Sequence, residues 1–341
     1  MSFKNIIGQD KAIRIIRDSA QDFEVSSSYL FIGPQGLGKF LTAKTLAKAV
    51  NCLEEKMDAC DRCTSCLKIE KNQHPDVHII DACLSNSAEP DEQSLQGQEK
   101  KKTEAVKIEQ IRQLQKEANL KPYEARKKVF IINDAHNLTE EAANALLKTL
   151  EEPPRDSLII MVTAKPQLLL KTVISRCRRI KFYPLPRAQL QDLLSNEYSV
   201  EASFAHFLAY FCEGRIGQAL ALKDTGIFNE KNKIIDEFVL EEQAAFGYRR
   251  DLQSQDLRKC LNILASWFRD IYMLKVGMPH AELVNFDRRD ELLKSMAGYS
   301  IGALDDITRF ISQAFLYLEQ NINPKLVAAN LKIGYLAEHI A

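Results

Sequence analysis

The sequence predicts an α/β domain built on a parallel sheet, followed by a part that is entirely helical. The apolar run 29–32 leads into a glycine-rich turn and then a helix. Two further runs, 129–132 and 158–163, are short and apolar enough to be buried parallel strands. From about residue 229 onward the apolar residues follow helical spacing, without a strand pattern. A chain of 341 residues is too long for one small core, so two or three domains are expected.

The glycine-rich turn has the layout of a phosphate-binding P-loop. Gly33, Gly36 and Gly38 allow backbone N–H groups to curve around an anion, and Lys39 would reach the β- and γ-phosphates of a nucleotide. The next residue should be Ser or Thr, whose hydroxyl holds Mg²⁺, but here it is Phe40. An amphipathic helix follows, which favours a P-loop over the alternative of a glycine turn that binds nothing.

Four cysteines cluster directly after the helix that follows the P-loop. The short spacings suit thiolates that converge on a tetrahedral zinc ion, and the residues are Cys52, Cys60, Cys63 and Cys66. Four thiolates leave no open coordination position, so the predicted zinc is structural. A vestigial or redox-active cluster is the alternative, and disulfides are not expected in a reducing cytosol.

Composition excludes some classes of function. Lys and Arg number 46, as do Asp and Glu, so no net charge draws the chain to nucleic acid or membrane, and any DNA contact must be local. The sequence has no apparent signal peptide and no apolar run long enough to span a bilayer, which predicts a cytoplasmic protein. Residues 84–105 are strongly polar and are expected to form a mobile loop.

The strand predicted at 129–132 ends in Asn133 and Asp134, where a P-loop ATPase carries an Asp for Mg²⁺ and then a Glu for the attacking water. If Asn133 takes the first position, the metal carboxylate has become an amide; if Asp134 takes it, the base position is Ala135. One catalytic carboxylate is missing either way. Thr163 ends the next strand and either senses a γ-phosphate or only closes that strand.

Three longer motifs carry a resemblance to a known family. They are residues 144–154 (NALLKTLEEPP), 166–167 and 172–177. Together they closely resemble the clamp-loader branch of the AAA+ family, whose bacterial members also carry a cysteine module at this place. The resemblance implies an AAA+ P-loop domain over 1–182 with a zinc module at 52–66, a helical lid over 183–228 and a helical collar over 229–341.

Within that family, the resemblance implies a subunit that does not hydrolyse ATP. The gamma/tau motor subunits have an intact P-loop and an Asp-Glu pair. This chain has Phe40 and Asn133-Asp134 at these places instead. ATP or ADP could still bind at Lys39 without turnover. Ser175-Arg176-Cys177 matches the family motif whose arginine reaches the ATP of an adjacent subunit, so Arg176 is the expected arginine finger. The implied partners are gamma/tau and delta subunits, the sliding clamp and primer–template DNA.

Three other functions stay open from the sequence. The chain could be an active ATPase of the same family or a stand-alone nucleotide-binding switch. It could also be a nucleic-acid-binding module that uses the basic residues Arg176, Arg178 and Arg179.

Overall fold

The computed structural model describes residues 2–21, 27–55, 58–82, 105–240 and 254–330. The chain divides into two compact units, Met1–Pro184 and Leu185–Ala341. The predicted mobile loop 84–105 lies outside the described residues, apart from its last residue. The finer predicted division of the second unit, at residue 228, stays a prediction.

The first unit contains a five-stranded sheet in which every neighbouring pair of strands is parallel. The strand order is β2-β3-β4-β1-β5. The strands are β1 (Ser28–Ile32), β2 (Val77–Ile80), β3 (Lys128–Ile132), β4 (Ser157–Thr163) and β5 (Arg178–Lys181). The parallel sheet predicted from the apolar runs is therefore confirmed.

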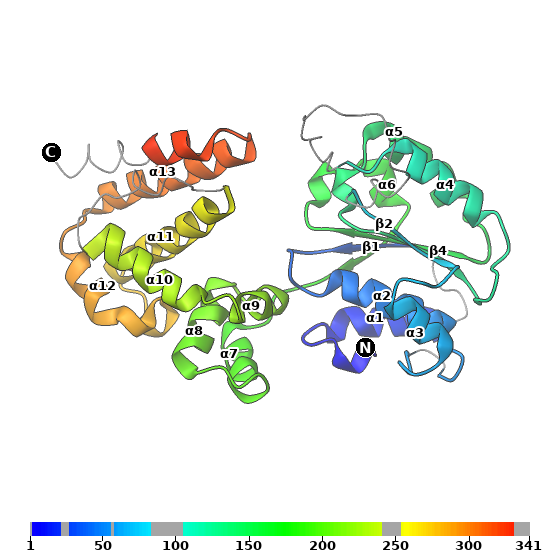
Figure 1. The fold of residues 1–341 in the computed structure, drawn as a ribbon, viewed down its shortest axis with the longest axis horizontal. Coiled ribbons are helices and arrows are strands. Elements are labelled where there is room, and N and C mark those ends of the chain that lie inside the picture. The colour runs from blue at the N-terminus through cyan, green and yellow to red at the C-terminus, as the bar shows by residue number, and fades with distance from the viewer. Residues whose placement is uncertain (1, 22–26, 56–57, 83–104, 241–253, 331–341) are drawn as a thin grey trace, which may run out of the picture. The chain divides into compact units, whose positions relative to one another are not determined.

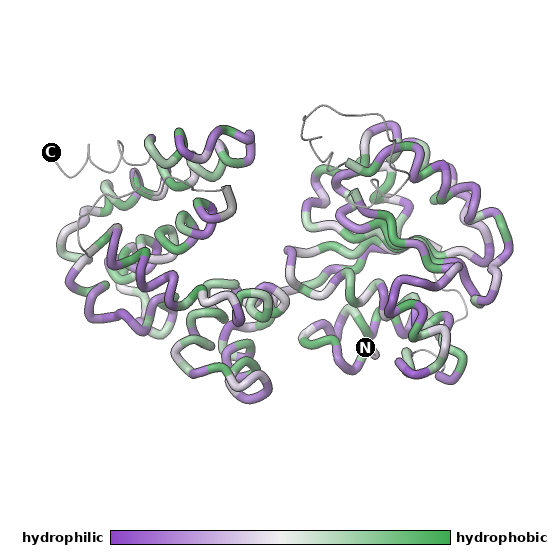
Figure 2. The backbone as a smooth tube through the Cα atoms, in the orientation of Figure 1, coloured by the Kyte–Doolittle hydropathy of each residue, from purple (hydrophilic) through white to green (hydrophobic). Residues whose placement is uncertain are grey.

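Helices cover both faces of this sheet (Figure 1). One face packs against α1 (Asp10–Gln21), α2 (Lys39–Asn51) and α3 (Thr64–Glu70). The other packs against α4 (Ile108–Ala118), α5 (Glu140–Glu151) and α6 (Lys171–Ser175). Successive residues of a strand point to opposite faces, so Phe31 joins the first core while Leu30 joins the second. Burial on both faces explains why β1, β3 and β4 are nearly continuous apolar runs, seen as green tubes at the centre of the sheet in Figure 2.

The second unit is helical throughout its described part. Its α-helices are α7 (Arg187–Asn196), α8 (Ala202–Phe211), α9 (Ile216–Lys223), α10 (Ile227–Ile235), α11 (Ser254–Lys275), α12 (Arg289–Met296) and α13 (Ile301–Glu319). Trp267 and Phe207 are among its fully buried side chains. The predicted helical C-terminal part is thus confirmed.

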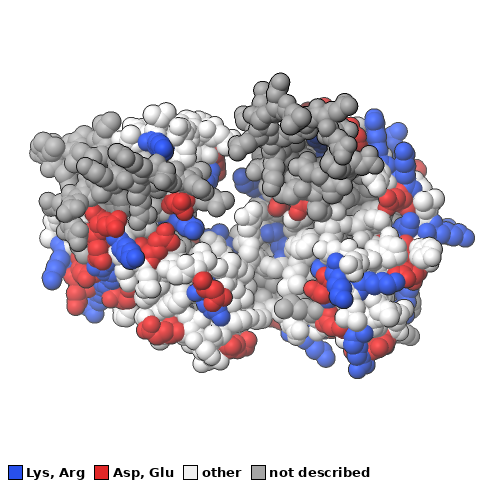
Figure 3. All heavy atoms as spheres, viewed as in Figure 1, with Lys and Arg blue, Asp and Glu red and all other residues white. Residues whose placement is uncertain are grey.

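Short helical turns complete both units. They are η1 (Phe3–Asn5), η3 (Ala135–Asn137), η4 (Pro166–Leu168), η5 (Asp236–Leu240), η7 (His280–Glu282) and η8 (Phe286–Arg288). None of the helices in the described ranges is long and apolar enough to cross a membrane. Acidic and basic side chains both occur on the visible face of each unit (Figure 3), as expected for a chain with no net charge.

Candidate functional site

The parallel sheet brings the predicted nucleotide-binding residues to one edge. Ile32, the last residue of β1, pairs with Thr163 at the end of β4. β3 lies on the other side of β4 and ends at Ile132, opposite Met161. The carboxyl ends of these strands therefore meet where the P-loop begins, which is where ligands bind in open α/β sheets.

Two glycines of the P-loop occupy positions that a side chain would disturb. Gly38 has a left-handed backbone with φ 76° and forms the N-cap of α2. A Cβ atom on Gly33 would lie 2.6 Å from the carbonyl oxygen of Phe182. The Gly33 N–H donates a hydrogen bond to the Thr163 carbonyl (3.3 Å), which joins the start of the loop to β4. The backbone of a phosphate-binding loop is therefore formed.

Lys39 is held by its own loop. Its side chain lies at the start of α2, the residue is only 6 % exposed, and Nζ donates to the Pro34 carbonyl oxygen at 2.6 Å. Burial lowers the pKa of Lys39 to about 8, although the negative charge of Asp134 opposes this shift. A phosphate would have to compete with the Pro34 carbonyl for the ammonium group.

Phe40 takes the place of the magnesium-binding hydroxyl. Its side chain is partly buried and packs against the core between the sheet and α1, α2 and α3. The nearest hydroxyls on the same helix are engaged with the backbone: Thr42 Oγ1 donates to the Gly38 carbonyl (2.8 Å) and Thr45 Oγ1 to the Leu41 carbonyl (2.9 Å). In these first turns of α2, no free hydroxyl replaces the one that Phe40 lacks.

The residues after β3 form a polar cluster. Asn133 donates from its amide to Asp81 (3.2 Å), so its side chain is engaged with the residue that follows β2. Asp134 is a non-glycine residue with a left-handed backbone, φ 43°. Such a conformation is unfavourable for an L-residue, although Asp tolerates it better than most.

Thr163 is fully buried, and its hydroxyl already has two partners. Its Oγ1 accepts the Lys165 N–H (3.1 Å) and lies 3.3 Å from His136 Nδ1. Burial lowers the pKa of His136, partly opposed by Asp134, and the positive charges of Lys165 and Lys39 lower it further. His136 was not predicted from the sequence, because only the turn after β3 brings it to β4. A γ-phosphate role for Thr163 stays a prediction.

Arg176 lies away from the P-loop of its own chain. It follows α6, two residues before β5 begins at Arg178, and Arg178 pairs with Tyr29 near the start of β1. β1 ends at Ile32, three residues or roughly 10 Å beyond Tyr29, and the P-loop begins directly after that end. Arg176 therefore belongs to the edge of the sheet opposite the P-loop. Its side chain is about one third exposed, and its guanidinium pairs with Glu151 (2.6 Å).

The four clustered cysteines converge as predicted. Their Sγ atoms all lie within 4.8 Å of one another, and Cys60 Sγ and Cys66 Sγ are 4.0 Å apart. Tetrahedral zinc with bonds of about 2.3 Å needs sulfurs roughly 3.8 Å apart, so the cluster has the right size. The N–H groups of Cys63 and Cys66 point at the thiols of Cys60 and Cys63. The cluster could bind a metal, and the donor set suits structural zinc.

Burial disfavours the ionised form of the Cys66 thiol when no cation is bound. The pKa of the Cys66 thiol is raised, first by burial and further by its neighbouring cysteines. Several ionised thiols this close together therefore need a positive ion to offset their repulsion. Among the described cysteines none forms a disulfide, and the scattered Cys177, Cys212 and Cys260 are buried.

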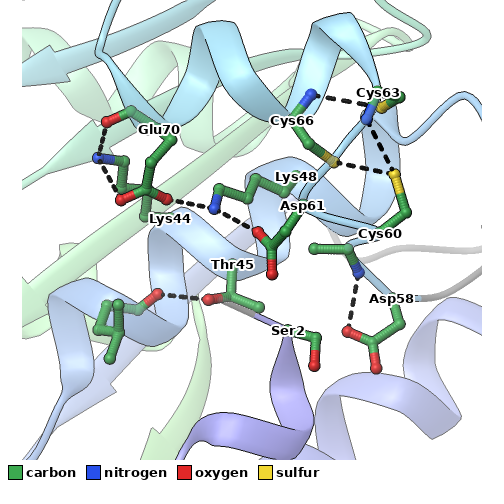
Figure 4. A network of polar contacts seen from close by, with 12 residues as sticks. Ser2, Lys44, Thr45, Lys48, Asp58, Cys60, Asp61, Cys63, Cys66 and Glu70 are labelled. Atoms are coloured by element: carbon green, nitrogen blue, oxygen red, sulfur yellow. Dashed lines mark hydrogen bonds and ion pairs between the residues drawn. The ribbon is translucent and has the colours of Figure 1, made fainter.

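An ion-pair network ties the cysteine module to the helix that follows the P-loop (Figure 4). Lys48 of α2 has a side chain only 2 % exposed, and its Nζ contacts Asp61 at 2.7 Å and also Glu70. Burial would lower the pKa of Lys48, but the hydrogen bonds to both carboxylates outweigh it and raise the pKa. Asp58 accepts the Phe3 N–H (2.9 Å) and pairs with Arg17 of α1 (2.7 Å). The module thus contacts three parts of the unit.

Arg215 is engaged inside the second unit. Its Nε donates to the Cys212 carbonyl at 2.9 Å, just before α9 begins. Gly217 lies in α9, two residues after Arg215, and has no side chain that could contact a phosphate. Arg215 Nη2 also lies 3.9 Å from Glu213, so both of these contacts are local to the turn before α9.

The fold and the site together define a P-loop α/β protein with a cysteine module and a helical second unit. A family profile described as "DNA polymerase III, delta subunit" matches residues 8–186, and its C-terminal counterpart matches 229–331. The chain belongs to the clamp-loader family of DNA polymerase III.

Two relatives from Bacillus subtilis agree with this assignment. The chain is 32 % identical to "DNA polymerase III subunit delta'" of Bacillus subtilis over 279 residues, which cover 79 % of this chain and 78 % of that protein. It is 31 % identical to subunit tau of the same organism over 94 % of this chain, but spans only 54 % of tau. A gamma subunit-related protein of Thermotoga maritima is 18 % identical with a TM-score of 0.42, over 96 % of this chain and 98 % of that one.

Proposed function

We propose that the chain is a delta-prime-type stator of the DNA polymerase III clamp loader. In this proposal it does not hydrolyse ATP itself, and it presents Arg176 to the ATP of a neighbouring gamma/tau subunit. The complete loader, which also contains delta, opens the sliding clamp and closes it on primer–template DNA. Contacts of this chain with DNA are made to the backbone and are weak and salt-dependent.

The observation that carries the proposal is the separation of Arg176 from the P-loop of its own chain. An arginine that follows α6 at one edge of the sheet cannot reach a nucleotide at the opposite edge, where Gly33 follows β1. A partly exposed arginine side chain at that edge supports contact with a partner's phosphate, because its guanidinium is permanently charged and planar. Such a finger supplied in trans is worth about 10³–10⁵ in rate.

The geometry of the P-loop supports the other half of the proposal. Phe40 packs into the core and offers no oxygen to Mg²⁺, and the Asn133 side chain is a neutral amide engaged with Asp81. The glycine backbone and Lys39 are still placed to bind phosphate, so ATP or ADP binding without hydrolysis is part of the proposal.

The test is ATP turnover with Mg²⁺, measured for the isolated chain and for a loader reconstituted with gamma/tau and delta in the presence of clamp and primed DNA. The isolated chain is expected to show no turnover above background. Arg176→Ala in the complex is expected to lower kcat by at least about 100-fold, because the finger acts on the transition state. Arg178→Ala is the matched control and leaves the rate unchanged.

One alternative function has an observation in its favour. The chain aligns with subunit tau over 94 % of its length and keeps the phosphate-binding backbone, as an active ATPase would. Brisk turnover by the isolated chain would establish this alternative and end the stator proposal. A normal rate for the Arg176→Ala complex would refute the finger.

A further inference from the structure

We propose that Glu151 is the positioning residue for the Arg176 finger. Its carboxylate fixes the guanidinium in the orientation that meets the neighbouring ATP. This inference rests on the proposed function, because it concerns how Arg176 acts there. Glu151 touches no nucleotide and works only through Arg176.

The guanidinium is held at two of its nitrogens by two different helices. Nη2 contacts Glu151 Oε1 at 2.6 Å, and Glu151 is the last residue of α5. Nη1 donates to the Thr172 carbonyl at 3.0 Å, and Thr172 belongs to α6. Two contacts to two separate nitrogens define the plane of the group, which a single contact cannot do.

These contacts leave donors free for a phosphate. A guanidinium carries five N–H donors, of which the two contacts use two. Nε–H and one N–H on each of Nη1 and Nη2 remain. The side chain of Arg176 is 35 % exposed, so part of the group faces solvent. Arg176 can therefore keep both restraints while it donates to phosphate oxygens of a partner.

The backbones that carry the pair are firmly packed. Leu150, directly before Glu151, and Val173, at the centre of α6, are buried in the same core on one face of the sheet. Cys177, directly after Arg176, is buried in that core as well. The Arg176 N–H also donates to the Val173 carbonyl at 3.2 Å. The ion pair thus joins two partly exposed side chains whose backbones are firmly packed.

The pairing is specific to one arginine and occupies an unfavourable helix position. Among the described residues, the neighbouring Arg178 and Arg179 have no ion-pair partner, whereas Arg176 does. Glu151 stands in the last turn of α5, where the helix dipole disfavours a carboxylate. The charge of Arg176 offsets this repulsion locally.

The experiment measures kcat and KM for ATP of the reconstituted loader with Glu151→Gln, in the presence of clamp and primed DNA. Glutamine keeps the size of the side chain and removes its charge. We expect kcat to fall about fivefold with KM unchanged, since an exposed ion pair restrains its partner only modestly and the finger acts in the transition state. Glu152→Gln is the matched control: it removes the same charge one residue later and leaves kcat unchanged.

Two further variants separate the possible failures. If Arg176→Ala leaves turnover intact, the proposed function fails and this inference fails with it. If Arg176→Ala slows turnover but Glu151→Gln is as fast as the wild type or faster, only the positioning role is overturned. In the Arg176→Ala background, Glu151→Gln is expected to cause no further loss. The full chain's Tm should be equal for both glutamine variants, so that a purely structural effect of Glu151 would be detected as a lower Tm.

Discussion

Lys39 is the residue on which the proposed nucleotide site depends most directly. Its ammonium is buried and donates to Pro34, and it is the group that a phosphate would displace from that carbonyl. The sequence predicted the lysine from the glycine pattern around it. It could not predict the contact with Pro34, which depends on the curvature of the folded loop.

The lowered pKa of Lys39 predicts a pH dependence of nucleotide binding. Phosphate binds the charged form, and with a pKa of about 8 this form is the main one at pH 7 and the minor one at pH 9. The affinity for ADP without Mg²⁺ is therefore expected to fall about tenfold between pH 7 and pH 9. Isothermal titration calorimetry at the two pH values measures this change.

Lys39→Arg is the matched control because guanidinium stays charged across this range. Its ADP affinity should be independent of pH between 7 and 9. The titration can also be followed by NMR of lysines labelled at Cε, where one signal with a midpoint near 8 should disappear in the Arg variant. Asp134 and His136 lie beside this site, so a midpoint that persists in the variant would assign the titration to another group.

At the scale of elements, the cysteine module contacts α2, the helix that follows the P-loop. Cys52 is the C-cap of α2, and the Lys48 side chain from the same helix contacts Asp61 of the module and Glu70 at the end of α3. Asp61 itself has a left-handed backbone, φ 57°, in the turn between Cys60 and Cys63. The spacing of the cysteines predicted the cluster. The carboxylate partners of Lys48 could not be predicted, because the amphipathic pattern of a helix does not show which of its charged side chains is buried.

Removal of the metal is therefore expected to loosen the first unit. A strong chelator should remove one zinc per chain and lower the Tm of this unit by about 10 °C or more, since metal binding contributes to folding free energy. Cys63→Ser should have the same effect without chelator. The check is calorimetry together with a metal assay, and Cys212→Ser in the second unit is the control that keeps the zinc.

The carboxylates around Lys48 provide a second check on the module. Lys48→Met keeps the length of the side chain and leaves Asp61 and Glu70 without their cation. It should retain zinc but lose stability, by a few kcal/mol at most because both carboxylates are partly exposed. A zinc-free chain with unchanged Tm would contradict the structural role of the cluster.

At the scale of the whole molecule, the sequence predicted those features that depend on the spacing of neighbouring residues. Buried strands, the P-loop turn and the helical C-terminal part each depend on local spacing and composition. Thr139 is a local signal of the same kind: it is the N-cap of α5, and its side chain accepts the Ala142 N–H. Contacts between distant segments were not predictable: Thr163 with His136, Asn133 with Asp81 and Glu151 with Arg176 all join separate elements. Each depends on the strand order, which a single sequence does not reveal.

The division into two units predicts that each unit unfolds independently, and a substitution at Gly214 tests this prediction. Gly214 has a left-handed backbone with φ 78°, and a Cβ atom there would lie 2.0 Å from the Leu185 carbonyl oxygen. Gly214 cannot move aside easily, because its carbonyl accepts the Leu185 N–H (3.0 Å) and its N–H donates to Ala209 (3.1 Å). Gly214→Ala is therefore expected to destabilise the second unit by about 3 kcal/mol or more.

Gly226→Ala is the matched control for this substitution. Gly226 has a similar backbone, φ 70°, but no atom lies within 4 Å of the position of an added Cβ. It should cost only the left-handed backbone penalty of about 1 kcal/mol. In calorimetry of the full chain, Gly214→Ala should lower the Tm of the second unit only, and chelator should lower the Tm of the first unit only. A single transition that responds equally to both would mean that the two units unfold as one, since independent cores cannot share a stability change made in only one of them.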